Sequence, residues 1–92
     1  MLVVSADARN RHADDAIVVP IFSGGPLGPT RVPIDAGVGG LPHASVLFCE
    51  ELTTIDHDFF ADGPLGPRVP ADLLARVVRS VRRALGDVVL EP

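Results

Sequence analysis

The sequence predicts a mainly β protein of the α+β class, with one amphipathic helix near its C-terminus. Three observations support this prediction. Short runs rich in β-branched residues alternate with Gly- and Pro-containing breaks over residues 2–50, as is typical of a small β domain. A single later stretch repeats its apolar residues at helical spacing. The chain has 92 residues, so we expect residues 1–92 to form one domain.

The first half of the chain contains two predicted strands. Leu2–Val4 is a short apolar run, and the polar segment Asp7–Ala13 that follows suits one helical turn. Ala16–Phe22 is almost continuously apolar and β-branched, which indicates a strand covered on both faces. Pro20 lies inside this run and has no N–H to donate to a neighbouring strand. We therefore expect an edge position or a bulge at this residue.

Two further strands are predicted after a Gly- and Pro-rich break. Arg31–Asp35 is a short candidate, and Ser45–Glu50 is a stronger one. Alternation along the second strand puts Phe48 and Glu50 on one face and Cys49 on the other. The break itself belongs to a repeated motif, because Gly25–Pro33 recurs as Gly63–Pro70. We interpret both copies as rigid connectors from a turn into a strand.

The predicted helix covers Ala71–Leu85. Pro70 suits the first helical position and Gly86 a C-terminal stop. The apolar residues form one stripe, made of Leu73, Leu74, Val77, Val78, Val81 and Leu85. The arginines cover the opposite side, at Arg76, Arg79, Arg82 and Arg83. Such a positive face is either solvated or a contact for an acidic partner or for RNA phosphates.

Composition excludes several classes of protein. The formal net charge is −4, which is unlike a general phosphate binder, although a local arginine patch can still face nucleic acid. One cysteine excludes an internal disulfide, and three scattered histidines do not indicate a zinc site. The apolar runs are far shorter than the roughly 20 residues of a membrane helix. No basic segment precedes an apolar leader region, so we expect a cytoplasmic protein.

The order of these pieces resembles a known family. The resemblance covers Leu2–Ser5 with Asn10, then Val18–Gly25, Gly40–Asp56 and finally Arg83–Gly86. These segments are similar to the MazF/PemK (Kid) toxins of type II toxin–antitoxin systems. The most specific part is Ser45–Asp56, with its Ser-Val start, its Cys-acid pair and its Thr-apolar-Asp end.

This resemblance implies a fold, an activity and partners. The fold would be a small MazF/CcdB-like, SH3-like β-barrel with a C-terminal helix, paired as a homodimer. The activity would be sequence-specific cleavage of single-stranded RNA without a metal or other cofactor. The partner would be a cognate antitoxin with an acidic, disordered tail. The chain starts inside the first matched strand, so we expect a shortened domain that lacks the family's opening strand.

The resemblance also implies catalytic residues, and two of them remain. The family's Thr-Ser pair at the end of the second matched strand becomes Phe22-Ser23, so Ser23 keeps a hydroxyl. Its arginine and acid, two residues apart on the Cys-containing strand, become Phe48 and Glu50. The acid survives and the cation does not. Glu50 is then either the general base or an ordinary exposed acid, and we expect cleavage to be reduced or absent.

Two pairs of residues are candidates for RNA binding. Phe22 and Phe48 place rings where relatives hold polar groups, so they either stack on RNA bases or fill space left by the absent strand. Asp7 and Asn10 either cap the first helical turn or contact RNA. Cys49 is expected to be a buried, unreactive residue.

Two other functions stay open. One is a degenerate toxin homologue that binds only antitoxin or RNA. The other is a gyrase poison of the CcdB type, which would act on a protein and leave RNA uncut.

Overall fold

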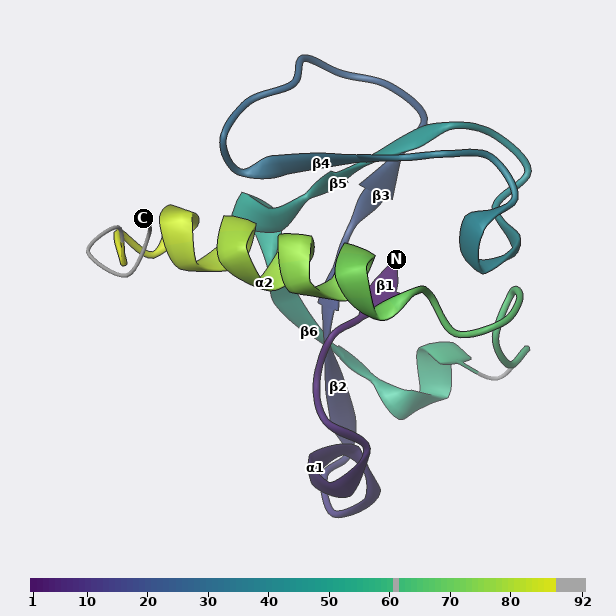
Figure 1. Ribbon diagram of the computed structural model, residues 1–92. Coiled ribbons are helices and arrows are strands. Elements are labelled where there is room, and N and C mark those ends of the chain that lie inside the picture. Colours follow the sequence, from purple (N-terminus) through teal and green to yellow (C-terminus); the bar gives the residue numbers. More distant parts are fainter. Residues whose placement is uncertain (61, 88–92) are drawn as a thin grey trace.

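Six strands form two three-stranded antiparallel sheets in the computed structural model, which describes residues 1–60 and 62–87 (Figure 1). The first sheet has the order β1-β2-β6, with bounds Leu2–Val3, Asp15–Val19 and Thr53–Asp56. The second has the order β3-β5-β4, with bounds Ile21–Phe22, Ser45–Phe48 and Arg31–Ile34. The remainder of the predicted 1–92 domain lies outside the described residues.

Two chain segments connect one sheet to the other. Pro20 separates β2 from β3, and the 3-10 helix η2 (Cys49–Glu51) lies between β5 and β6. The Phe48 N–H donates to the Pro20 carbonyl at 3.1 Å, so the two segments stay paired at the bend. The segment Ala16–Phe22, predicted as one strand with an edge position or a bulge at Pro20, is thus divided at Pro20 into strands of two sheets. Glu50 lies on η2 rather than on the predicted strand, because β5 ends at Phe48.

The predicted combination of β-sheets with a C-terminal helix is confirmed. Closure of the sheets into the predicted small β-barrel is not seen in the described part of the chain. Among the described residues, the strand pairings leave β1 and β6 at the edges of one sheet and β3 and β4 at the edges of the other. No helix in this part of the chain is long and apolar enough to cross a membrane.

The core lies between the β3-β5-β4 sheet and the helix α2 (Ala71–Ala84). Leu47 is at its centre, because β5 pairs with β3 on one side and with β4 on the other. Its side chain is completely buried, as is Val77 of the helix. The buried core cluster comprises Val19, Val32, Ile34, Leu47, Cys49, Leu73 and Val77.

The ends of α2 follow the sequence prediction closely. Pro70 is the N-cap residue rather than the first helical one. At the other end the Gly86 N–H donates to the Arg83 carbonyl and the Asp87 N–H to the Arg82 carbonyl. These two bonds form a Schellman motif. It needs a left-handed residue, and Gly86 supplies it with φ +83°.

The buried face of α2 is rotated from the predicted stripe. Leu73, Val77 and Ser80 are buried, whereas Val78 and Leu85 are 46% and 75% exposed. Ser80 tolerates burial because its hydroxyl forms a hydrogen bond with the Cys49 thiol of η2. The helix therefore packs with a polar residue toward the sheet, which the apolar spacing alone did not predict.

The two copies of the repeated motif take different roles. The first copy leads into β4, as expected, but the second leads into α2, so its interpretation as a connector into a strand is wrong. Gly66 of the second copy packs against the 3-10 helix η1 (Val38–Gly40). A Cβ at Gly66 would lie only 2.6 Å from the Gly40 Cα. Two further short helices complete the description, α1 (Asp7–Arg11) and η3 (His57–Phe60).

Candidate active site

Arg31 is the residue around which the candidate site forms. It is the first residue of β4, and the antiparallel register pairs it with Phe48 of β5. Its guanidinium carbon lies 3.9 Å from the centre of the Phe48 ring. A cation over an aromatic face is attracted by the negative face of the ring. Arg31 on the neighbouring strand thus places a positive charge beside Phe48, the position at which the family resemblance expects an arginine.

The Glu50 carboxylate accepts hydrogen bonds from two residues, Arg31 of β4 and Thr30 immediately before this strand. Arg31 Nη2 and Nε donate to its carboxylate at 2.8 Å and 3.1 Å, and the Thr30 hydroxyl donates at 3.0 Å. The side chains of Arg31 and Glu50 are 24% and 31% exposed. The Arg31 hydrogen bonds hold the pKa of the Glu50 carboxyl below its usual range. Glu50 is therefore ionised at neutral pH.

Phe22 and Phe48 form an aromatic pair beside this ion pair. Their ring centres are 4.5 Å apart and the rings are tilted by 51°. Phe22 is 42% exposed. We call the group formed by Phe22, Arg31, Phe48 and Glu50 the Arg31 cluster.

The loop between β3 and β4 folds back onto the Arg31 cluster. The Pro26 carbonyl accepts a hydrogen bond of 3.0 Å from Arg31 Nη1. Gly25 has φ +131°, and a Cβ there would lie 2.8 Å from Phe48 Cζ. Only glycine fits against the ring in this conformation. The first copy of the repeated motif thereby helps to position the ring and the guanidinium.

Three of the predicted site residues, Phe22, Phe48 and Glu50, come together here, and Ser23 does not join them. Phe22 pairs with Val46, so the chain leaving β3 at Ser23 moves toward the start of β5. Glu50 follows the other end of β5. Among the described residues, no hydrogen bond links the exposed Ser23 to Glu50.

Asp7 and Asn10 lie on α1, outside the Arg31 cluster. The N-cap residue of α1 is Ala6 and makes no side-chain capping bond, so the expectation that Asp7 and Asn10 cap this turn is wrong. Asp7 instead pairs with Arg68 at 3.3 Å on the surface. The Asn10 amide is engaged with Ser5, whose hydroxyl donates to it at 2.6 Å.

Cys49 is inert, as the sequence predicts. It is 1% exposed, and burial raises the pKa of its thiol to about 11. In the part of the chain that the structure describes, no three His, Cys, Asp or Glu side chains are grouped to hold a metal ion.

The sequence reasoning missed Arg31 and Thr30. Both are separated from Glu50 by about twenty residues, so no local spacing connects them. The signal that could have found Arg31 is the antiparallel pairing of the predicted strands 31–35 and 45–50, which can place residue 31 opposite residue 48.

The fold and the site together define a class: a small β protein with a C-terminal helix and a surface arginine–carboxylate pair beside an aromatic pair. The sequence model of the PemK-like, MazF-like toxins of type II toxin–antitoxin systems matches residues 1–85. The chain therefore belongs to this family. No curated protein sequence matches it significantly.

Solved structures agree with this assignment. A chain of the MazE–MazF crystal structure (Form-I) from Deinococcus radiodurans is 26% identical, with a TM-score of 0.77, over 92% of this chain and 79% of that one. Mycobacterium tuberculosis toxin MazF-mt6 has the same fold, with 24% identity and a TM-score of 0.76, over 92% and 83% of the two chains. An endoribonuclease from a mycobacterial species, in complex with its cognate antitoxin, is 25% identical over 92% and 78%, with a TM-score of 0.72.

Proposed function

We propose that this toxin-family protein is a metal-independent, sequence-specific endoribonuclease that cleaves single-stranded RNA. The observation that carries the proposal is the position of Arg31, whose guanidinium lies over the Phe48 ring and binds Glu50. The family resemblance expects an arginine and an acid at positions 48 and 50. Here the acid is retained, and an arginine from the adjacent strand provides the cation.

The chemistry requires a base, a charge stabiliser and a proton for the leaving group. In the proposed reaction Glu50 takes the proton of the 2′-hydroxyl, whose oxygen attacks phosphorus while the bond to the 5′-oxygen breaks. Solvent supplies the proton to that leaving oxygen. Arg31 has five N–H donors, and three are used by Glu50 and Pro26. The two others can stabilise the charge on the phosphorane.

The same contacts support a slow reaction. A carboxylate whose pKa is lowered stays ionised but accepts a proton less readily. Much of the Arg31 guanidinium is also already bonded to Glu50. These features favour, as a second candidate, a degenerate homologue that binds only antitoxin or RNA.

The other candidate residues take supporting roles in this proposal. Phe22 and Phe48 stack on RNA bases, since the exposed Phe22 ring extends the face of the pair. Ser23 contacts RNA beyond the far end of the rings and takes no part in proton transfer. Asp7 and Asn10 contact a distal part of the RNA.

Two protein partners belong to the proposal. We expect a homodimer for two reasons. A 92-residue chain buries only a modest core, and the family resemblance implies a paired domain. We also expect a cognate antitoxin with an acidic tail. In support, the similar solved structures include a MazE–MazF structure and an endoribonuclease in complex with its cognate antitoxin.

The decisive experiment incubates the protein with a long single-stranded RNA and maps 5′-hydroxyl ends, with and without a chelator. We expect ends at defined sequences that a chelator does not remove. Glu50→Gln should slow cleavage by roughly 10²–10³-fold, as loss of a positioned catalytic group does. Glu51→Gln is the matched control, because Glu51 is the exposed neighbour on the same short helix.

Two outcomes would contradict the proposal. Equal slowing by both substitutions would remove Glu50 from the mechanism. Absence of ends with the unaltered protein, together with retained binding of RNA or antitoxin, would establish the binding-only function instead.

A further inference from the structure

Thr30 is joined to the segment that carries Glu50 through both its backbone and its side chain. The Cys49 N–H donates to the Thr30 carbonyl at 2.9 Å, and the Thr30 hydroxyl donates to Glu50 Oε1 at 3.0 Å. The backbone bond fixes the residue before β4 against the first residue of η2. The hydroxyl therefore reaches the carboxylate from a fixed position on the chain.

The two oxygens of the Glu50 carboxylate have different partners. Oε2 accepts from Arg31 Nη2 at 2.8 Å and from Arg31 Nε at 3.1 Å. Oε1 accepts from the Thr30 hydroxyl at 3.0 Å, whereas Arg31 Nε is 3.5 Å away, too far for a strong bond. Each carboxylate oxygen has about two lone-pair sites. The guanidinium thus uses both sites of Oε2, and Oε1 keeps one site open.

This arrangement departs from the usual geometry of an arginine–carboxylate pair. An arginine commonly forms two parallel bonds, one to each oxygen of the carboxylate. Here both short bonds from Arg31 end on the same oxygen of Glu50, and the other oxygen is bonded to Thr30. The Thr30 hydroxyl provides a physical reason, because it competes with the Arg31 Nε for Oε1.

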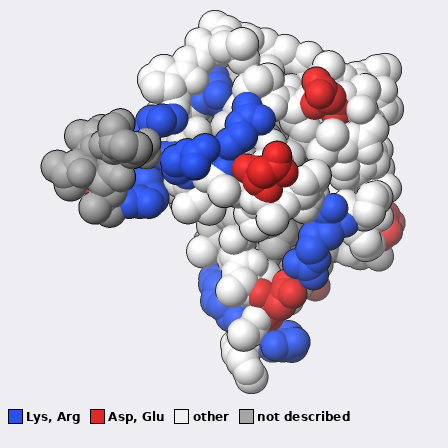
Figure 2. Space-filling model, in the orientation of Figure 1, with Lys and Arg blue, Asp and Glu red and all other residues white. Residues whose placement is uncertain are grey.

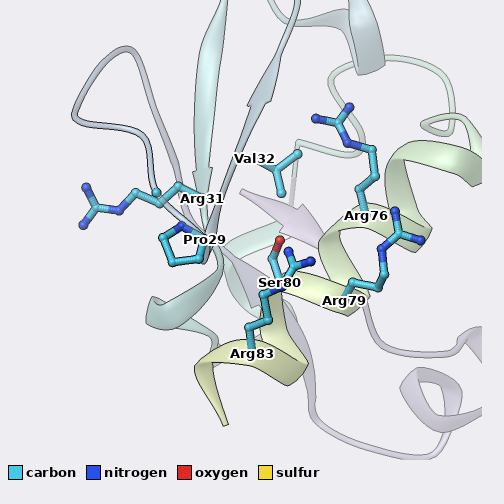
Figure 3. A pocket seen from close by; sticks show the side chains of 8 residues that line it. Pro29, Arg31, Val32, Arg76, Arg79, Ser80 and Arg83 are labelled. Carbon is cyan, nitrogen blue, oxygen red and sulfur yellow. The ribbon is translucent and has the colours of Figure 1, made fainter. Parts of the chain in front are cut away.

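The basic side chains of α2 do not take part in this arrangement. Side chains alternate along a strand, and Val32 is buried in the core against the helix, so Arg31 lies on the opposite face of the sheet. Figure 2 shows basic side chains gathered along α2, and Figure 3 shows Arg31 directed away from Arg76 and Arg79. In the described part of the chain, these two arginines donate no hydrogen bond to Glu50. The orientation of the carboxylate is therefore set from the start of β4.

We propose that Thr30 is a positioning residue that turns Glu50 Oε1, with its open lone pair, toward the 2′-hydroxyl of the substrate. This role in the reaction rests on the proposed function. In the step, the 2′-hydroxyl proton passes to Oε1 and the 2′-oxygen attacks phosphorus with the freed electron pair. The 5′-oxygen leaves with the electron pair of the broken bond. Thr30 neither gains nor loses a proton.

The test compares Thr30→Val, which has nearly the same shape without a hydroxyl, with Thr30→Ser, which keeps the hydroxyl without the methyl group. Cleavage rates over a range of RNA concentrations give kcat and KM for each variant. Thr30→Val should lower kcat roughly 10-fold with little change in KM, the effect of losing one hydrogen bond to a charged group. Thr30→Ser should keep most of the kcat.

A crystal structure of Thr30→Val gives a readout that does not depend on activity. We expect its carboxylate to turn, so that Arg31 Nε donates to Oε1 and Nη2 to Oε2 as a parallel pair. Circular dichroism melts check that each variant folds, and Thr30→Ala provides a second variant without a hydroxyl. The matched control is Thr54→Val, at an exposed threonine of β6, which should leave kcat and KM unchanged.

Equal losses of kcat in Thr30→Ser and Thr30→Val would assign the effect to the methyl group and overturn the proposal. An unchanged kcat in Thr30→Val would also overturn it, as would an equally large loss in Thr54→Val. The same holds for a Thr30→Val structure in which both short bonds from Arg31 still end on Oε2.

Failure of the proposed function gives a different result. If the unaltered protein cuts no RNA, Thr30 has no reaction to assist, and both proposals are rejected. If Glu50→Gln slows cleavage while Thr30→Val keeps its kcat, the proposed function stands and only the role of Thr30 is rejected.

Discussion

Arg31 connects three features that the chain brings together from separate segments. Its guanidinium covers the Phe48 ring, binds the Glu50 carboxylate and donates to the Pro26 carbonyl. A lysine could not reproduce this arrangement, because it has no planar group with donors on three nitrogens. The residue therefore positions the ring, the acid and the loop at once.

The Arg31–Glu50 pair makes stability depend on pH. The pKa of Glu50 is lowered in the folded state, so its ionised form stabilises the fold above its usual value of 4.5. That contribution is lost as the pH falls through the lowered pKa. We expect the unaltered protein to melt a few °C, at most about 5 °C, above Glu50→Gln at pH 7, with the difference vanishing in stronger acid.

Thermal melts followed by circular dichroism at several pH values would measure this difference. Glu51→Gln again serves as the control and should show no comparable change. If the difference in melting temperature between the unaltered protein and Glu50→Gln grew on acidification, the ionised Arg31–Glu50 pair would not be the source of the stability.

Cys49 provides a second prediction at this scale. The thiolate is the reactive form, and burial raises the pKa of Cys49 from 9.0 to about 11. We expect a disulfide reagent at pH 8 to label the native protein about 100-fold or more slowly than the unfolded chain. The same reaction in denaturant is the control, and rapid labelling of native protein would contradict burial of the thiol.

At the scale of elements, α2 is held by a narrow buried face. Val77 is completely buried against the sheet, whereas its neighbour Val78 is 46% exposed. Ser80 takes part in the same face through its hydrogen bond with Cys49. Substitution of Val77 should therefore cost more stability than substitution of its neighbour Val78, although both residues are valines.

We expect Val77→Ala to lower the free energy of unfolding by roughly 1–3 kcal/mol, because it removes buried methyl groups and leaves a cavity. Val78→Ala should change it by no more than about 0.5 kcal/mol. Denaturant titrations followed by circular dichroism measure both. Equal effects would mean that the face of α2 toward the sheet is assigned incorrectly.

At the scale of the whole molecule, two connections hold the sheets and loops in one arrangement. Paired segments cross between the sheets at Pro20 and η2. Separately, the segment before α2 packs against η1 through a close approach of Gly66 and Gly40. Both connections fix where the helix lies relative to β4.

The repeated motif offers a matched test of the second connection. Gly28 and Gly66 occupy the same position in the two copies, but a Cβ meets nothing within 4 Å at Gly28 and meets Gly40 at 2.6 Å at Gly66. Gly66→Ala should destabilise the protein by roughly 1–3 kcal/mol. Gly28→Ala should be neutral or stabilising by up to about 1 kcal/mol. Denaturant titrations measure both, and equal effects would contradict the close packing.

Most elements of this protein follow from local patterns of residues. Strand and helix patterns depend on residues close together in the chain, so β1, β2, β4 and β5, the helix with its Gly86 end and the buried Cys49 were predictable. The separate strand β6 and the division of Ala16–Phe22 between two sheets were not predicted. The family was also recognisable, because its residues stand in order along the chain.

Which side chains meet depends instead on how distant segments pack. The contact of Arg31 with Phe48 and Glu50 depends on strand register, and the separation of Ser23 from Glu50 depends on the direction of β3. The burial of Ser80 depends on how α2 is rotated against the sheet. Each of these follows from packing between segments distant in sequence, which no local pattern of residues encodes.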